Sequence, residues 1–413
     1  MRVLILSQFF EPEPLPKTMD LAQGLVARGH SVTVITGFPN YPSGNLYPGY
    51  RIRLFARDTV RGIPVLRTAL FPSHGTSITG RLANYGSFML SSVLGAFLTP
   101  ACDVMYVWHP PLTIGVSAWL IGRLKGIPYV YDVQDIWPDG GVWTGIVRSG
   151  GFLVRAMHLL ERFVYAKADH LLVVTEGAKR NLMAKGVPER KLSIASQLSD
   201  DKLFSRYDPA RADEIARRFG FSERFVVMFT GNIGLVQGLD SALAAAGLLQ
   251  DAHPDVLFAI IGDGTDRGRL MAQSKALGLK SVLFIDHQPM KDIPDFVANA
   301  GALLLPLKPS PISELAIPLK TFAYMASGRP IVAALTGAAA DLISRAGAGF
   351  AVDPENPQAL ADAILRLKAL TAEERAAIGA RARAYLVAHH SKERVIDDHV
   401  AMLANACHSG TGA

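Results

Sequence analysis

Cysteine is nearly absent from the sequence, and charged residues are sparse. The 413 residues include only two cysteines, Cys102 and Cys407, which form none of the spacings that bind zinc. Two isolated thiols are typical of a cytosolic protein whose cysteines stay reduced. Charged residues make up 19% and hydrophobic residues 49% of the chain, a balance that excludes a disordered or fibrous protein.

The sequence also lacks a charged leader and a long, purely hydrophobic segment. Met1–Phe10 has the pattern of a strand, so we expect no signal peptide. Leu82–Cys102 carries no charge along a length that suffices to cross a bilayer, but it contains several polar residues and Pro100. This composition favours an apolar helix that is buried or lies at a membrane interface over a membrane span. The mean hydropathy of +0.22 supports membrane contact.

Basic residues are concentrated in the first half of the chain. Residues 1–191 contain 20 Lys and Arg against 12 Asp and Glu, whereas the remainder contains 22 against 24. This asymmetry suggests an anionic partner. Five arginines lie close together among aromatic residues: Arg51, Arg53, Arg57, Arg61 and Arg67. Because no nucleic-acid module accompanies them, an anionic membrane surface or a phosphate-bearing partner fits better than nucleic acid, and a solvated face is the alternative.

Short β-rich runs alternate with helical patterns through both halves of the chain. The length corresponds to two or three domains, and this alternation predicts parallel sheets covered on both faces. We therefore predict an α/β fold with two doubly wound, Rossmann-like domains that face a central cleft at the carboxyl ends of their strands. The predicted parts are an N-terminal domain at 1–200, a C-terminal domain at 201–388, and a segment at 389–413 whose helix packs back on the N-terminal domain.

Two glycine-rich turns follow predicted strands in the second half. The strand at Phe225–Phe229 leads into Thr230-Gly231-Asn232-Ile233-Gly234, with Gln237-Gly238 just before a helix. The strand at Leu257–Ile261 leads into Gly262-Asp263-Gly264. Glycines let the backbone approach a ligand, and the start of a helix offers free N–H groups to phosphate. The alternative for each motif alone is an ordinary tight turn.

A third motif combines a loop, a helix and a glycine stop. It runs Glu314-Leu315-Ala316-Ile317-Pro318-Leu319-Lys320-Thr321-Phe322-Ala323-Tyr324-Met325-Ala326-Ser327-Gly328-Arg329-Pro330. Lys320 lies in the first turn of the predicted helix, where a cation opposes the helix dipole. That position makes sense if Lys320 neutralises a bound phosphate, and a solvated lysine is the alternative.

The order of these three motifs resembles the retaining family-4 glycosyltransferases of the GT-B fold. Within them the chain is most similar to a subgroup that adds N-acetylfucosamine and related acetamido-deoxyhexoses in bacterial surface-polysaccharide synthesis. The first half adds motifs of the same subgroup: Gly37-Phe38-Pro39-Asn40-Tyr41-Pro42, Tyr131-Asp132-Val133-Gln134-Asp135-Ile136-Trp137-Pro138-Asp139 and Leu160-Glu161-Arg162-Phe163. The resemblance extends to about Ala388.

The resemblance implies that a nucleotide-sugar donor binds to the C-terminal domain and the acceptor to the N-terminal domain. The residues that it places at the donor are Gly231, Asn232, Gln237, Gly262, Asp263, Gly264, Pro318, Leu319, Lys320 and Thr321. The acceptor-side candidates are Lys17, Asn40, Tyr41 and His109. A solvent-facing lysine and a structural histidine are the alternatives for Lys17 and His109. The resemblance implies no cofactor and no metal ion.

Departures from the family pattern in the C-terminal domain concern charge. Asn232 and Gln237 are neutral where many relatives carry Arg and Lys, so Lys320 is expected to supply more of the charge that stabilises the leaving diphosphate. Leu315 and Ala323 occupy the positions of two family glutamates. Glu314 is therefore the candidate to replace the first of them at the donor sugar, with an ordinary loop carboxylate as the alternative.

A further departure lies in the N-terminal domain. Gln134-Asp135 stands where many relatives have His-Asp, so Asp135 is the candidate catalytic carboxylate facing the donor sugar. The alternative is that Asp135 caps the turn at Trp137-Pro138.

These observations predict a retaining, metal-independent glycosyltransferase. We expect it to move an N-acetylated deoxyhexose or related hexosamine from a UDP-sugar to a polyprenyl diphosphate-linked or glycan acceptor. The basic, apolar first half predicts a cytoplasmic protein bound peripherally to the inner face of the cell membrane. Two alternatives stay open: a sugar-nucleotide 2-epimerase of similar architecture, and a non-catalytic GT-B partner protein that lacks the two family glutamates.

Overall fold

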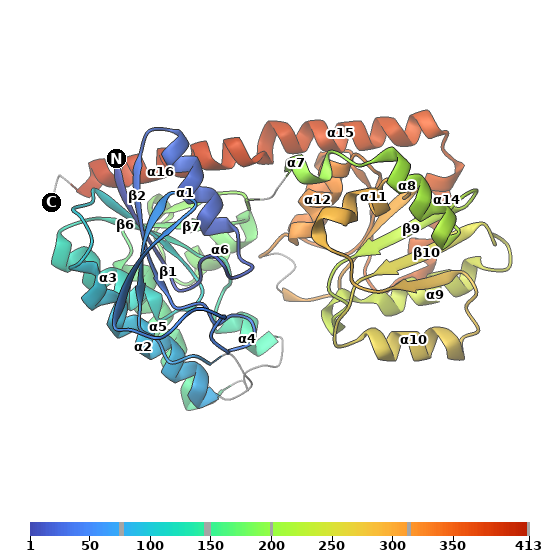
Figure 1. The fold of residues 1–413 in the computed structure, drawn as a ribbon. Helices are drawn as coiled ribbons and strands as arrows, with labels where there is room; N and C mark the ends of the chain where they lie inside the picture. The colour runs from blue at the N-terminus through green and yellow to red at the C-terminus, as the bar shows by residue number, and fades with distance from the viewer. Residues whose placement is uncertain (74–77, 144–149, 199–200, 312–314, 411–413) are drawn as a thin grey trace. The chain divides into compact units, whose positions relative to one another are not determined.

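The computed structural model describes residues 1–73, 78–143, 150–198, 201–311 and 315–410 (Figure 1). The chain divides into two compact units. The N-terminal unit comprises Met1–Leu198 and Glu393–Ala413, and the C-terminal unit comprises Ser199–Lys392. The predicted boundary at residue 200 lies close to this division.

An eight-stranded sheet forms the centre of the N-terminal unit. Its order is β3-β4-β2-β1-β5-β6-β7-β8, and every neighbouring pair is parallel except β3 and β4. The strands are β1 (Arg2–Ser7), β2 (Ser31–Gly37), β3 (Phe55–Val60), β4 (Ile63–Thr68), β5 (Val104–Trp108), β6 (Tyr129–Asp132), β7 (His170–Val173) and β8 (Leu192–Ile194). β5 and β6 are buried at every position, because helices cover both faces of a parallel sheet.

Helices connect most of these strands, as parallel pairing requires. They are α1 (Lys17–Ala27), α2 (Ile78–Ala96), α3 (Ile114–Lys125), α4 (Asp139–Trp143), α5 (Phe152–Lys167), α6 (Glu176–Ala184) and the 3₁₀ turn η1 (Glu189–Lys191). α3 ends at Gly126, whose φ of 66° is the left-handed conformation that glycine adopts at helix ends.

The C-terminal unit contains a six-stranded, all-parallel sheet in the order β11-β10-β9-β12-β13-β14. The strands are β9 (Phe225–Thr230), β10 (Val256–Ile261), β11 (Val282–Ile285), β12 (Ala302–Pro306), β13 (Ile331–Ala334) and β14 (Gly349–Val352). The chain order reverses between β9 and β12. In doubly wound sheets the loops at the carboxyl ends of such neighbouring strands diverge and leave room for a ligand.

The helices of the C-terminal unit lie between these strands and after them. They are α7 (Asp201–Phe204), α8 (Pro209–Phe219), η2 (Leu235–Gln237), α9 (Leu239–Leu249), α10 (Arg267–Ala276), η3 (Met290–Asp292), α11 (Ile293–Val297), α12 (Leu319–Ser327), α13 (Ala338–Arg345), α14 (Pro357–Ala369) and α15 (Ala372–His390). α15 begins with a capping box in which Thr371 and Glu374 bond to each other's backbone N–H groups.

The last helix, α16 (Lys392–Gly410), belongs to the N-terminal unit although it follows the C-terminal unit in sequence (Figure 1). Its Val395, Ile396 and Leu403 are part of the N-terminal core. Ile396 lies against Gly24 of α1, where a Cβ atom would contact the isoleucine side chain. The glycine thus lets α16 approach α1 closely.

The prediction of two Rossmann-like α/β domains is confirmed. The sequence patterns did not identify β3, which forms an antiparallel hairpin with β4. That hairpin corrects one expectation: Arg67 is only 1% exposed and does not belong to an exposed arginine cluster. Its guanidinium donates to the Asp58 carboxylate at 3.1 Å and to the Glu11 carbonyl oxygen at 2.7 Å.

The uncharged stretch Leu82–Cys102 forms most of α2, which ends at Ala96. One face of α2 buries Asn84, Phe88 and Ser92, and the opposite face exposes leucines. Among the described helices, none has the length and the apolar character needed to span a bilayer.

Candidate active site

The two glycine-rich loops of the C-terminal unit pack directly on each other at the carboxyl edge of its sheet. The backbone N–H of Gly231 donates to the carbonyl oxygen of Ile261 at 3.0 Å, which continues the β9–β10 ladder beyond the strands. The N–H of Ile233 donates to the carbonyl oxygen of Asp263 at 2.8 Å. These bonds place Gly231, Asn232, Gly262 and Gly264 together beside the point where the strand order reverses.

Close packing between these loops explains two of the glycines. A Cβ atom at Gly262 would overlap the carbonyl oxygen of Gly231, and one at Gly264 would overlap the carbonyl oxygen of Ile233. Their φ values of 144° and 158° also disfavour other residues. Asp263 itself is exposed, and its carboxylate accepts a hydrogen bond from the Gly264 N–H at 2.8 Å.

Lys320 brings a buried positive charge to these loops. Its ammonium donates to the Gln237 side-chain oxygen at 2.8 Å and lies 3.9 Å above the centre of the Phe229 ring. The salt bridges of the described residues do not include Lys320. Burial lowers the pKa of Lys320 to about 7, because the ammonium loses water and no carboxylate of the described residues pairs with it. A bound anion would supply the missing countercharge.

Two helices begin beside Lys320 without a side-chain cap. The N-cap residues are Gly238 for α9 and Pro318 for α12. Neither residue has a side chain that accepts a hydrogen bond from the first backbone N–H groups of its helix. The first N–H groups of a helix need acceptors, and they attract anions. Leu319, Lys320 and Thr321 form the first turn of α12, so the arrangement has the elements of a diphosphate site.

The N-terminal unit gathers a second group of polar residues around Asp132, at the end of β6. Lys17 forms a salt bridge with Asp132 at 2.8 Å, and both side chains are at least nine-tenths buried. Tyr106 and Gln134 also donate to the Asp132 carboxylate. Burial by itself raises the pKa of Asp132, but Lys17, His399 and Tyr106 together outweigh burial and hold that pKa below its usual value. Lys17 therefore points into the unit at Asp132.

His109 follows β5 and is 1% exposed, with neither ring nitrogen bonded within the described residues. Burial lowers the pKa of His109 to about 4, so the imidazole is neutral near pH 7. Its ring lies 5.8 Å from that of Tyr131. An unbonded, neutral imidazole at the carboxyl edge of the sheet has the capacity to bond a hydroxyl group.

Glu13 links its own loop, after β1, to the loop after β2 that contains Asn40 and Tyr41. One carboxylate oxygen accepts the backbone N–H groups of Asn40 and Tyr41, both at 2.8 Å, and the other accepts that of Phe10 at 3.0 Å. Asn40 is buried, whereas Tyr41 is partly exposed and packs on Phe9. Burial raises the pKa of Glu13 despite these three bonds.

Asp135 is an exposed residue, but its carboxyl group is partly surrounded by protein, and this desolvation raises the pKa of the group. Glu314 lies outside the described residues, so its role stays a prediction. Leu315, at one family glutamate position, is buried in the C-terminal unit. Among the described residues, no cluster of three His, Cys, Asp or Glu side chains forms a metal site.

The sequence patterns did not single out Asp132, Glu13 or Tyr324. The Tyr324 hydroxyl accepts the Thr230 N–H at 2.9 Å and so ties α12 to the end of β9. Asp132 is the last residue of β6, and the carboxyl ends of parallel strands are where ligand-facing residues lie, so its place after a β-rich run was an available signal. Glu13 lies in a proline-containing loop and gave no such signal.

Comparison with known proteins agrees with this architecture. The family model described as "Glycosyl transferase 4-like domain" matches residues 16–195, and "Glycosyl transferases group 1" matches residues 211–385. A crystal structure of HepE from Anabaena superposes with a TM-score of 0.71 at 18% identity, covering 98% of this chain and all of that one. The chain is a GT-B glycosyltransferase. These matches favour a transferase over an epimerase or a non-catalytic partner.

Relatives of this GT-B glycosyltransferase include bacterial glycosyltransferases. WcaI of Escherichia coli, a glycosyl transferase assigned to colanic acid biosynthesis, is 24% identical over 87% of this chain and 90% of its own length. The alpha-D-kanosaminyltransferase of Streptomyces kanamyceticus is 28% identical over 84% of this chain and 88% of its own length. The similarity to WcaI supports a surface-polysaccharide transferase, and the N-acetylfucosamine subgroup stays a prediction.

Proposed function

We propose that the protein transfers a sugar, with retention of anomeric configuration, from a UDP-sugar to a polyprenyl diphosphate-linked acceptor in bacterial surface-polysaccharide synthesis. The observation that carries this proposal is the partly buried Lys320 ammonium, which forms no salt bridge with a described residue and lies beside Gly231 and two uncapped helix starts. The HepE structures contain UDP or UDP-glucose, which supports a UDP-linked donor here.

The charge at Lys320 suits the leaving group of this reaction. When the bond between the anomeric carbon and the diphosphate oxygen breaks, negative charge grows on the diphosphate. An ammonium and helix N–H groups that are already in place stabilise that charge without reorganisation. The acceptor hydroxyl forms the new bond to the anomeric carbon, and its proton leaves with the diphosphate. We propose Gly231, Asn232, Gln237, Gly262, Asp263, Gly264, Pro318, Leu319 and Thr321 as further donor contacts.

The N-terminal unit is proposed to bind the acceptor through His109, Asn40 and Tyr41. The neutral, unbonded imidazole of His109 fits a sugar hydroxyl better than a phosphate. Lys17 acts through its salt bridge with Asp132 in this proposal.

Asp135 and Glu314 are proposed as the carboxylates that face the donor sugar, which we expect to be an N-acetylated deoxyhexose or a related hexosamine. We propose no metal ion and no cofactor.

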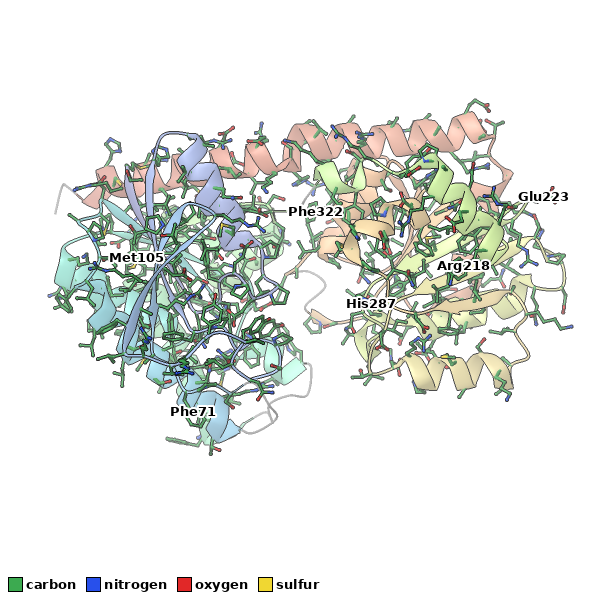
Figure 2. All side chains as sticks on the ribbon, viewed as in Figure 1. Phe71, Met105, Arg218, Glu223, His287 and Phe322 are labelled. Atoms are coloured by element: carbon green, nitrogen blue, oxygen red, sulfur yellow. The ribbon has the colours of Figure 1, made fainter. Side chains whose placement is uncertain are left out.

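Membrane association is proposed for the exposed face of α2. Leu82, Leu90 and Leu94 are spaced four or eight residues apart and are 54%, 63% and 55% exposed. Residues at this spacing lie on one face of a helix. Phe71, at the edge of the N-terminal unit in Figure 2, and Phe97 are also exposed. An apolar helical face of this kind binds at the headgroup boundary, on the cytoplasmic side in our proposal.

The direct test is nucleotide release from a panel of UDP-, GDP- and dTDP-sugars, with and without polyprenyl diphosphate-sugar acceptors. The proposal expects UDP release from one acetamido sugar donor only when an acceptor is present. The K320A variant is expected to lose at least a hundredfold in turnover, because one charge-stabilising contact contributes about 3–4 kcal/mol in such sites. Near-normal turnover of K320A would contradict the role of Lys320, and release of GDP or dTDP would contradict the donor.

A further inference from the structure

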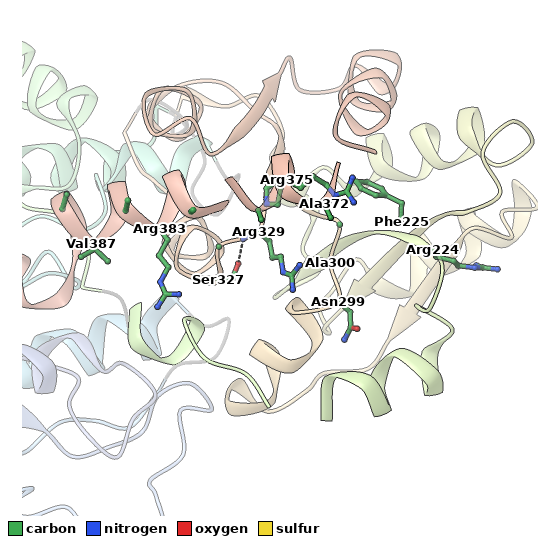
Figure 3. Close-up of a pocket in the computed structure, with 17 residues that line it drawn as sticks. Arg224, Phe225, Asn299, Ala300, Ser327, Arg329, Ala372, Arg375, Arg383 and Val387 are labelled. Carbon is green, nitrogen blue, oxygen red and sulfur yellow. Dashed lines mark hydrogen bonds between the residues drawn. The ribbon is translucent and has the colours of Figure 1, made fainter. Parts of the chain in front are cut away.

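A long hollow runs along α15 of the C-terminal unit (Figure 3). Its larger part has a volume of about 1010 Å³ and lies where α15 faces the residues that precede β9, β12 and β13. These are the amino ends of the strands, whereas the candidate donor site lies at the carboxyl ends. A smaller hollow of about 240 Å³ shares Arg383 and Val387 with the larger one. We call the two hollows together the α15 groove.

Small residues create the space in the α15 groove. Gly379 lies so close to the turn after α12 that a Cβ atom would overlap the Gly328 carbonyl oxygen. This contact holds α15 near the turn, while the alanines beside it, Ala376, Ala380 and Ala384, are too short to fill the gap. The hollow therefore forms because the backbones at Gly379 and Gly328 lie close together while the neighbouring side chains of α15 are short.

The charges along the α15 groove are all of one sign. Its basic side chains are Lys202, Arg206, Arg224, Arg329, Arg375 and Arg383. Among the described residues, no Asp or Glu lines either hollow. The sequence of the C-terminal unit contains 21 Lys and Arg and 21 Asp and Glu, so composition alone does not account for this segregation. A concave surface lined by one sign of charge concentrates counter-ions.

Structural roles account for only part of this charge. Arg375 donates to carbonyl oxygens at the end of α14 and lies 5.6 Å from the Phe225 ring centre, and Arg329 donates to the Ala298 carbonyl oxygen. Neither Arg329 nor Arg383 belongs to a salt bridge of the described residues. Partial burial of the Arg329 guanidinium lowers its pKa, and no carboxylate of the described residues offsets this effect. Arg383 is exposed at the junction of the two hollows.

We propose that the α15 groove binds a phosphate or diphosphate group, at a site separate from the donor site. Guanidinium groups bind phosphate oxygens through paired, charge-assisted hydrogen bonds. Arg329 and Arg383 both line the larger hollow, so an anion there would meet positive charge that the salt bridges of the described residues leave unneutralised. The alanines, Pro330 and Val387 provide an apolar wall for the rest of the ligand. This chemistry fits a soluble phosphate ester and the headgroup of an anionic lipid.

The test is isothermal titration calorimetry of sodium diphosphate into the full chain. The K320A background removes the lysine of the donor site, so binding in that variant reports the groove. We expect K320A to bind one diphosphate per chain, and K320A/R383E to bind it at least tenfold more weakly. K320A/R381E is the control, because Arg381 is exposed on the same helix but lines neither hollow. Circular dichroism confirms that each variant is folded.

Absence of diphosphate binding by K320A would overturn the proposal, and so would equal affinities of the R383E and R381E variants. Flotation with phosphatidylglycerol vesicles distinguishes a lipid headgroup from a soluble phosphate ester as the ligand of the groove. If R383E reduces vesicle binding and R381E does not, the ligand is a lipid headgroup, whereas unchanged vesicle binding with weakened diphosphate binding assigns a soluble phosphate ester. A chain that binds diphosphate in the groove but releases no nucleotide would contradict the proposed transferase substrates and leave the groove proposal intact.

Discussion

At the scale of single residues, burial decides the chemistry of Lys320. A solvent-exposed lysine has a pKa of about 10.4 and carries its charge at every physiological pH. Within the described part of the chain the ammonium donates to the neutral Gln237 side chain, and burial brings the pKa of Lys320 to about 7. The free site therefore loses its positive charge just above neutral pH, and the charge returns when an anion binds.

This shift predicts a pH dependence of UDP binding. Above pH 7 the free Lys320 is mostly neutral and must take up a proton when it binds the diphosphate. The dissociation constant of UDP is therefore expected to rise with pH between 7.5 and 9, by at most tenfold per pH unit. Isothermal titration calorimetry across this range, in buffers of different ionisation enthalpy, measures both the affinity and the proton uptake.

The variant K320M provides the comparison. It is expected to bind UDP weakly, with little dependence on pH and no proton uptake above pH 7.5. K275M, which changes an exposed lysine of α10, is expected to behave like the unmodified chain. The same pH slope in K320M and in the unmodified chain would assign the titrating group elsewhere.

At the scale of elements, α2 has two different faces. Its buried face hydrogen-bonds with neighbouring segments through Asn84 and Ser91, which explains polar residues inside an otherwise apolar stretch. Its other face exposes leucines at helical spacing. The proposed interfacial position of α2 rests on this difference between a hydrogen-bonded inner face and an apolar outer face.

The double variant L90E/L94E tests this position. Each buried leucine contributes about 1.5–3 kcal/mol in an apolar environment, so the two charges are expected to lower partitioning onto phosphatidylglycerol vesicles at least tenfold. Vesicle co-sedimentation measures the effect. L248E, at a leucine of α9 that is 53% exposed, is the matched control in the C-terminal unit and is expected to bind like the unmodified chain. Equal losses in both variants would contradict a specific role for α2.

At the scale of the whole molecule, the chain crosses between its two units twice. The second crossing delivers α16 to the core of the N-terminal unit, where Ile396 is 2% exposed. The stability of that unit therefore depends on residues that follow the other unit in sequence. Donor binding, in contrast, is assigned to the C-terminal unit alone.

Calorimetric unfolding of I396A with and without UDP checks this division. Removing a buried isoleucine side chain lowers the free energy of unfolding by about 2–5 kcal/mol. We expect this loss in the unfolding transition of the N-terminal unit, whose temperature UDP does not raise. R394A, at an exposed position of the same helix, is expected to leave both transitions in place. A lowered transition that UDP does raise would show that α16 stabilises the C-terminal unit instead.

The sequence by itself determined the α/β class, most of the strands and the glycine-rich loops, because buried parallel strands and tight turns depend on local composition. Lys320 was also identified from its place in a helical first turn. These features follow from residues that are neighbours along the chain.

Only the tertiary structure decided which polar groups have partners. Lys17 meets Asp132, Arg67 meets Asp58 and Glu11, and the arginines of the α15 groove come together from several elements that are far apart in sequence. The pKa values of Lys320 and His109 also depend on burial by distant segments. The physical reason is that desolvation and charge pairing act through space, between residues whose separation along the chain gives no local signal.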